Sequence, residues 1–284
     1  MDLCLLQVHA HPDDEASKAA ATAARYAAEG VRTVLVTCTG GEAGEILNPA
    51  LDTPEVRANL PAVRMRELEE AVAALKYSAT HLLGYRDSGM PGTEANADPR
   101  NFWNAPVEEA TERLVRIIRE ERPQVIVAYS DDQETYPHPD HLRVHDIAIL
   151  AFDAAGDPAR FPDAGEPFAP LKLYYCGFTM RALKAAHAAL LASGRESPYE
   201  EWLEKRKDTD HRFTTRIDVG GYLAARAQAL AAHATQCPPD SFWFTLTPDE
   251  MREIYPWEEF IRARSRVPVP EGETETDLFH GIRG

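Results

Sequence analysis

Apolar runs of strand length alternate with patterns of helical period over residues 3–155 of the chain. Aliphatic and β-branched runs predict strands at Leu3–His9, Val31–Cys38, His81–Leu83 and Val125–Tyr129. Helical spacing, alanine content and proline or glycine boundaries predict helices at Ala16–Glu29, Ala62–Leu75, Pro106–Glu121 and Asp140–Ala155. This alternation predicts an α/β fold in which helices cover both faces of a Rossmann-like, mostly parallel sheet.

The composition changes at residues 156–170, which are rich in glycine, proline and aspartate and predict a domain edge. Beyond this segment the pattern predicts strands and helices in mixed order, at Leu171–Phe178, Met180–Ala192, Pro198–Lys207, Phe213–Val219 and Gly221–His233. Residues 245–284 mix aromatic residues with prolines and are expected to wrap around the body. We therefore expect a metal-binding core at 1–160 and a smaller C-terminal α+β lobe at 161–284 that completes the substrate pocket.

The net charge and the cysteine spacing indicate which partners and which cellular location to expect. The formal net charge of −16 argues against a general nucleic-acid or anionic-membrane partner, since no basic excess is present to neutralise phosphates. No run approaches the roughly 20 apolar residues of a membrane span. Residues 1–6 lead into a strand without the basic start of a signal peptide, and the 4 cysteines are widely spaced. These features predict a reduced, cytoplasmic location; the sequence predicts no oligomeric state.

Two short segments carry histidine and carboxylate directly after predicted strands. Residues 11–15 are His-Pro-Asp-Asp-Glu, and residues 136–141 are Tyr-Pro-His-Pro-Asp-His. Either segment alone is about as often a turn or a helix cap as a functional site. In parallel α/β sheets, however, ligands bind at the carboxyl ends of the strands, where both segments lie. Together they predict one shared site for a divalent metal.

The residue types suit a metal-dependent hydrolase. A catalytic zinc takes three ligands from His and Asp or Glu and keeps a position open for water, a set that His11, Asp14 and His141 can supply. Zinc lowers the pKa of water from 15.7 to about 7. Asp13 points away from its neighbour Asp14 in an extended chain and is therefore the candidate general base. His138 is the remaining imidazole in the second segment.

The other side chains of the second segment have supporting assignments. His138 can stabilise an oxyanion or protonate the leaving amine, and Tyr136 offers a hydroxyl that can reach an oxyanion. Asp140 can orient an imidazole. His9 is interpreted as a packed strand residue. Ferrous iron is an alternative to zinc in a site of this composition.

The two segments resemble the motifs of a known family. Residues 10–15, AHPDDE, and residues 138–141, HPDH, resemble the PIG-L/LmbE-like family of zinc-dependent N-deacetylases and amidases. The resemblance implies zinc on His11, Asp14 and His141 with Asp13 as base, and oxyanion or acid roles for His138 and Tyr136 with Asp140 in support. It also implies that Arg64 and Asp87 contact the sugar hydroxyls of a glucosamine-inositol substrate.

Two branches of that family remain open. Ser17-Lys18, residues 39–42 and residues 232–236 resemble the amidases that cleave mycothiol S-conjugates into an N-acetylcysteine conjugate and glucosaminyl-inositol. Residues 86–90 are more similar to the deacetylases of the N-acetylated sugar precursor, and residues 133–135 and Ala43 depart from the amidase pattern. We expect a small thiol–sugar conjugate as substrate.

The remaining pocket assignments follow from this resemblance. Lys18 is expected to meet the cysteinyl part of the substrate, and Glu42 a sugar hydroxyl. For His233, a position in the pocket wall competes with simple packing. The presence of Asp13 and His138 argues against a non-catalytic sugar- or thiol-binding protein. A metallophosphoesterase is disfavoured because such enzymes use two bridged metals and more ligands than this chain clusters.

Overall fold

A single sheet organises the computed structural model, which describes residues 2–132, 136–269 and 272–283. It has 7 strands in the order β3-β2-β1-β4-β5-β7-β6. The strands are β1 Cys4–His9, β2 Arg32–Thr39, β3 Ala79–Tyr85, β4 Val125–Tyr129, β5 Lys172–Gly177, β6 Thr215–Asp218 and β7 Trp257–Ser265. The five strands β3, β2, β1, β4 and β5 pair in parallel in this order, whereas β7 pairs antiparallel with both β5 and β6. The predicted α/β class with a mostly parallel sheet is confirmed.

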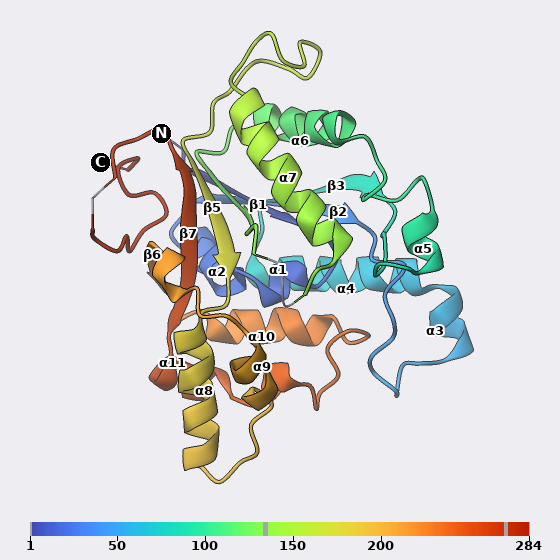
Figure 1. The fold of residues 1–284 in the computed structure, drawn as a ribbon, viewed down its shortest axis with the longest axis vertical. Helices are drawn as coiled ribbons and strands as arrows, with labels where there is room; N and C mark the ends of the chain where they lie inside the picture. The colour runs from blue at the N-terminus through green and yellow to red at the C-terminus, as the bar shows by residue number, and fades with distance from the viewer. Residues whose placement is uncertain (1, 133–135, 270–271, 284) are drawn as a thin grey trace.

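Helices cover both faces of this sheet (Figure 1). One face carries α6 Val107–Glu121 and α7 Pro139–Ala154, and the other carries α2 Ala20–Ala28, α4 Leu60–Leu75 and α10 Leu223–Ala232. The other described helices are α1 Asp14–Ser17, α3 Pro54–Ala58, α5 Glu94–Ala97, α8 Met180–Ala192, α9 Glu200–Lys205 and α11 Pro248–Ile254. β1 and β4 are buried along their whole length, because helices pack on both of their faces.

The strand order reverses between β1 and β4, the two central strands. β2 and β3 lie on one side of this pair, and β5, β7 and β6 on the other. In doubly wound sheets this reversal opens a crevice at the carboxyl ends of the strands, where ligands bind. The first motif follows β1 directly, and the second leads from β4 into α7. The topology therefore brings residues 11–15 and 136–141 to one edge of the sheet.

Two predicted elements differ from the structure. The expected helix at 16–29 is divided into α1 and α2, because Lys18 is extended and Ala19 adopts a left-handed φ of 57°. Alanine-rich composition favours a continuous helix, but it gives no sign that the Lys18 side chain contacts Asp14. The second difference is β7, a strand of 9 residues inside the segment expected only to wrap. Its four Glu and Arg residues obscure the strand pattern.

The sheet continues across residue 160, since β5 pairs with β4. The division into two domains at this residue stays a prediction. All four cysteines are buried and unpaired. Among the described residues, no helix combines the length and apolarity of a membrane span. Residues 133–135, where the sequence departs from the amidase pattern, lie outside the described residues.

Candidate metal centre and active site

The first motif turns sharply after β1. Asp13 has a φ of 113°, in the left-handed region, and its carbonyl oxygen accepts hydrogen bonds from the backbone N–H groups of Ala16 and Ser17, each at 3.1 Å. Asp14 is therefore the first residue of α1, and its side chain leaves the chain in a different direction from that of Asp13. The Asp14 carboxylate faces His11, whereas the Asp13 carboxylate faces Arg64.

The second motif begins α7. His138 is the N-cap, and its Nδ1 accepts a hydrogen bond from the backbone N–H of Asp140 at 3.2 Å. Pro139 follows at a position where its fixed φ suits a first helical turn. One turn of helix then places His141 beside His138, with their ring centroids 5.5 Å apart. Both imidazoles are buried, His138 at 5% and His141 at 3% exposure.

His11, Asp14 and His141 form a compact set of ligand atoms. The Asp14 Oδ2 atom lies 3.4 Å from His11 Nδ1 and 3.4 Å from His141 Nε2, and all three ligand atoms lie within 4.8 Å of one another. Two donors at 2.0–2.1 Å from one tetrahedral ion are separated by about 3.3 Å. The observed spacing fits a bound metal ion, so this buried cluster can hold one.

A second group, which shares His11, also has metal-ligand geometry and includes Asp87, His138 and Asp140. Its oxygens already have hydrogen-bond donors. Asp140 Oδ2 lies 3.1 Å from His11 Nε2 and accepts the Ser88 backbone N–H at 2.9 Å, while Asp140 Oδ1 accepts the Ser88 hydroxyl. Asp140 thus fixes the ring of His11 and leaves Nδ1 directed at Asp14. This contact is the one expected of a carboxylate that orients a metal-binding imidazole.

Charges around the cluster shift its pKa values strongly. Burial raises the pKa of Asp14, but Lys18 and His141 outweigh it and hold this pKa well below its usual range. Burial lowers the pKa of His11, but hydrogen bonds with Asp14, Asp140 and Asp87 raise it well above 6.5. The pKa of His141 falls to about 4 because of its burial. The carboxylates of Asp14, Asp140 and Asp87, which raise the pKa of His11, also attract a cation.

Asp13 lies beside the cluster rather than in it. Its Oδ2 atom accepts a hydrogen bond from Arg64 Nη2 at 2.9 Å, and its side chain is 27% exposed. Burial raises the pKa of Asp13, and the guanidinium of Arg64 opposes this rise. Its backbone N–H donates to Glu15 Oε2 at 2.9 Å, and Glu15 Oε1 lies 2.5 Å from Nε2 of His233. Arg64, Glu15 and His233 therefore support the candidate base.

The start of its own helix engages Nδ1 of His138. Because Nδ1 accepts the Asp140 N–H, the neutral ring carries its proton on Nε2, where it can donate to a developing oxyanion. Burial and the neighbouring His11 lower the pKa of His138, which favours this neutral form. Tyr136 is 54% exposed, and its ring centroid lies 5.9 Å from that of His138 and 5.4 Å from that of His141.

The structure places the predicted substrate residues in different surroundings. Lys18 Nζ lies 2.5 Å from Asp14 Oδ1, and Asp87 Oδ1 lies 3.6 Å from His11 Nε2, so both border the cluster. Glu42 instead forms an ion pair with the Arg86 guanidinium at 4.0 Å. The contacts that were predicted between these residues and a substrate stay predictions.

Two other predicted substrate residues are engaged within the protein. The Arg64 guanidinium donates to the carbonyl oxygens of Gly41 and Pro12, each at 2.5 Å, as well as to Asp13. Gly41 has a φ of 66°, and a Cβ there would collide with the guanidinium. His233 is fully buried on Glu15, which matches the packing alternative left open for it. Ser88 was missed by sequence reasoning, although its position just after β3 offered a signal.

The fold and the site together define a class of protein. A doubly wound sheet that holds a buried His₂Asp cluster with the carboxylate of Asp13 beside it is suited to metal-assisted hydrolysis. The model of the PIG-L family, described as GlcNAc-PI de-N-acetylase, matches residues 6–152. The chain belongs to the PIG-L family, and is thus a deacetylase or amidase that hydrolyses amide C–N bonds.

Two relatives carry different activities in their names. Mycothiol S-conjugate amidase of Streptomyces coelicolor is 43% identical over 290 residues, with 99% of this chain and 98% of that protein covered. 1D-myo-inositol 2-acetamido-2-deoxy-alpha-D-glucopyranoside deacetylase 1 of Frankia alni is 42% identical, with 97% of this chain and 99% of that protein covered. The two values are so close that identity does not separate the two activities.

Solved structures share the fold at low identity. N,N'-diacetylchitobiose deacetylase from Pyrococcus horikoshii has a TM-score of 0.63 at 19% identity, with 91% of this chain and 83% of that chain covered. The conserved protein TT1542 from Thermus thermophilus has a TM-score of 0.60 at 22% identity, with 95% and 99% covered. The agreement over most of each chain confirms the α/β architecture.

Proposed function

We propose that the protein is an amidase of mycothiol S-conjugates, which releases an N-acetylcysteine S-conjugate and glucosaminyl-inositol. The observation that carries this choice is the place of Lys18. The Ser17-Lys18 segment resembles the amidase branch of the family. The ammonium group of Lys18 lies 2.5 Å from a carboxylate oxygen of the candidate metal ligand Asp14. A lysine there is suited to contact the cysteinyl part of the substrate.

The metal in this proposal is zinc, with ferrous iron as the alternative. His11 Nδ1, Asp14 Oδ2 and His141 Nε2 would hold it, in keeping with their mutual spacing. A metal ion in such a site polarises a carbonyl group and lowers the pKa of water. Asp140 would keep the ring of His11 in place through its contact with Nε2.

The side chains supply the proton transfers. Asp13 takes a proton from the attacking water while the oxygen of that water bonds to the amide carbon of the substrate. Arg64 holds the Asp13 carboxylate in place. The N–H at Nε2 of His138 then donates to the oxygen of the tetrahedral adduct, where the phenol of Tyr136 assists it. The C–N bond breaks as the proton that Asp13 took from the water passes to the departing amine. General base catalysis of this kind contributes on the order of a hundred- to ten-thousand-fold in rate.

Hydrolysis of a bimane–mycothiol conjugate tests the proposal. The purified protein, loaded with zinc or ferrous iron, should release glucosaminyl-inositol as a free amine. Removal of the metal with a chelator should abolish turnover, and restoring the metal should restore it. Absence of amine release with either metal would exclude the proposed reaction.

A second candidate is deacetylation of N-acetylglucosaminyl-inositol. The resemblance of residues 86–90 to that branch favours it. Asp87 and Ser88 of this segment lie directly against the cluster, through His11 and Asp140. The kcat/KM for the conjugate, compared with that for the acetylated sugar under identical metal loading, decides between the two reactions. A higher value for the acetylated sugar would replace the first proposal with the second.

A further inference from the structure

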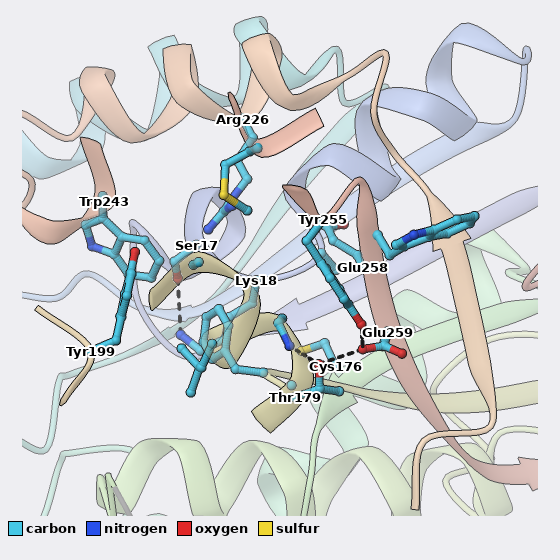
Figure 2. Close-up of a pocket in the computed structure, with 18 of the residues that line it drawn as sticks. Ser17, Lys18, Cys176, Thr179, Tyr199, Arg226, Trp243, Tyr255, Glu258 and Glu259 are labelled. Atoms are coloured by element: carbon cyan, nitrogen blue, oxygen red, sulfur yellow. Dashed lines mark hydrogen bonds between the residues drawn. The ribbon is translucent and has the colours of Figure 1, made fainter. Parts of the chain in front are cut away.

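A cavity separate from the metal-ligand cluster lies beside Lys18. Its volume is about 140 Å³, and its walls come from the residues around Lys18, the end of β5, α8, α9, α10 and the segment that contains Trp243 (Figure 2). Cys176 and Gly177 at the end of β5 line it, and β5 is the neighbour of β4 in the sheet. The cavity therefore opens at the same sheet edge as the candidate active site.

Ser17 and Lys18 connect the two spaces. Both line the cavity, and the Lys18 ammonium donates to Ser17 Oγ at 3.2 Å and to Asp14 Oδ1 at 2.5 Å. The other carboxylate oxygen of Asp14 faces His141. One lysine side chain thus separates the cavity from a candidate metal ligand. A substrate with its amide at the metal can reach the cavity by passing Lys18.

A cluster of aromatic side chains forms part of the cavity wall. The ring centroids of Phe242 and Trp243 are 4.3 Å apart, and Trp243 lies 6.1 Å from Phe178 and Trp202 lies 5.0 Å from Phe242. Leu183, Ala186 and Leu246 complete the apolar lining. Aromatic walls of this kind contact a flat ring by stacked or edge-on packing, which is more favourable than burial of area alone.

Besides Lys18, the cation Arg226 lines this space. The Arg226 guanidinium lies over the Trp243 ring at 5.6 Å and points into the cavity in Figure 2. Its buried Nε has no hydrogen-bond partner among the residues that the structure describes. On the opposite wall the carboxylate of Glu259 accepts hydrogen bonds from Thr179 and Tyr255, each at 2.6 Å. The acidic wall is therefore satisfied, while an arginine stacked on an aromatic ring favours a further π-system.

We infer that this cavity binds the sulfur-linked substituent of the thiol conjugate and favours a single aromatic ring. The inference rests on the proposed amidase function. In the conjugate only the Cα and Cβ of cysteine separate the amide carbon from sulfur, so a substituent on sulfur lies just past Lys18 when the amide is at the metal. An apolar protein cavity of about 150 Å³ holds one benzene molecule, which matches the size of this one.

A filled cavity tests the inference. Ala182→Leu on α8 adds bulk to the lining, whereas Ala188→Leu adds the same bulk to an exposed position of the same helix. The measured quantity is the ratio of kcat/KM for the S-benzyl conjugate to that for the S-methyl conjugate. Ala182→Leu should lower this ratio by about tenfold, the size of effect that a misfit in an apolar pocket produces. Ala188→Leu should leave the ratio unchanged.

A binding measurement separates the failure of this inference from that of the proposed function. S-benzyl-N-acetylcysteine should bind the wild type more tightly than its S-methyl counterpart, and Ala182→Leu should remove the difference, by calorimetry on metal-loaded protein. If neither conjugate is hydrolysed, the proposed function fails and the binding comparison still decides the inference. An unchanged ratio and unchanged binding in Ala182→Leu, with wild-type thermal stability, would overturn the assignment of the cavity.

Discussion

Asp13 combines a candidate chemical role with backbone strain. A non-glycine residue at a φ of 113° is rare and costs of order 1–3 kcal/mol. Hydrogen bonds at both ends stabilise it: its N–H donates to Glu15, its carbonyl oxygen accepts from α1, and its carboxylate pairs with Arg64. The conformation directs Asp13 and Asp14 to different sides. Strain of this kind, kept by surrounding contacts, is typical of functional positions.

Replacement of Asp13 separates strain from chemistry. Asp13→Gly and Asp13→Ala both remove the carboxylate, so kcat on the bimane conjugate should fall by roughly a hundred- to ten-thousand-fold in each. Glycine tolerates the left-handed backbone, so Asp13→Gly should be about 1 kcal/mol more stable than Asp13→Ala in urea unfolding. Activity within a few fold of wild type in both variants would show that Asp13 is not the base.

Asp140 is the second residue whose role can be measured apart from turnover. Its contact with His11 Nε2 orients a candidate ligand, so Asp140→Asn should weaken zinc binding by about 10–100-fold in a chelator competition. Ser88→Ala, which removes only the hydroxyl on Asp140, should have a smaller effect in the same direction. Loss of activity with unchanged zinc affinity would assign Asp140 to the substrate instead.

The residue types at the site could be predicted from the sequence, but their partners only in part. The motif spacing and the strand ends indicated His11, Asp14 and His141, which the fold does bring together. The assignment of Arg64 and Lys18 to a substrate stays a prediction, but the sequence did not show that each also pairs with a carboxylate of the first motif. A charged side chain in a sequence shows what it can bind, and not which of several acids the fold places next to it.

At the scale of elements, the helix ends depend on single residues. α4 ends at Lys76, which adopts a left-handed φ of 60° and is exposed. Its backbone N–H donates to the carbonyl oxygens of Ala73 and Val72. This conformation is the one that glycine adopts most readily at the end of a helix. The chain therefore carries a mild penalty at this position.

Lys76→Gly should remove that penalty. We expect a gain of about 0.5–1 kcal/mol in the free energy of unfolding, measured by urea denaturation with an unchanged m-value. Ala73→Gly, at an exposed position inside the same helix, is the matched control and should lose about 1 kcal/mol. Destabilisation by both glycines would mean that the Lys76 side chain makes a favourable contact that outweighs its backbone strain.

Elements that depend on local pattern were predicted well, and those that depend on distant contacts were not. β4 and α8 have the predicted bounds, because an apolar β-branched run and an alanine-rich amphipathic pattern determine them locally. β7 is a strand because β5 and β6 pair with both of its edges. Its neighbours supply the reason for its structure, and a pattern within residues 257–265 does not show it.

At the scale of the whole molecule, one buried carboxylate joins the C-terminal segment to the sheet. Glu275 Oε1 lies 2.6 Å from the ammonium of Lys172 on β5, and its Oε2 accepts from Tyr174 at 2.8 Å and Thr215 at 2.9 Å. Arg262 of β7 also pairs with it at 2.8 Å. The side chains of Lys172 and Glu275 are completely buried. The segment after β7 is therefore tied to three strands at once.

Glu275→Gln keeps the volume of this side chain but leaves Lys172 buried without a counter-charge. Breaking a buried ion pair on one side costs about 3–5 kcal/mol, so this variant should unfold at much lower urea concentration than wild type. The double variant Lys172→Met/Glu275→Leu removes both charges and should recover most of the loss. Equal instability of the single and double variants would place the stabilisation in packing and hydrogen bonds rather than in the charge pair.

Low pH should weaken the interactions of Glu275 with the sheet in the wild type. Burial raises the pKa of Glu275, but hydrogen bonds from Lys172, Tyr174 and Arg262 outweigh it and hold the pKa below 4.5. A carboxyl whose pKa is lowered by folding contributes stability that is fully present above its unfolded pKa and is lost as the pH falls through its folded pKa. The stability difference between wild type and Glu275→Gln should therefore be constant near neutral pH and shrink below pH 4.5. Urea unfolding of both proteins across this range measures it. A difference that stays constant down to the lowest pH of native structure would show that the Glu275 charge does not hold the C-terminal segment on the sheet.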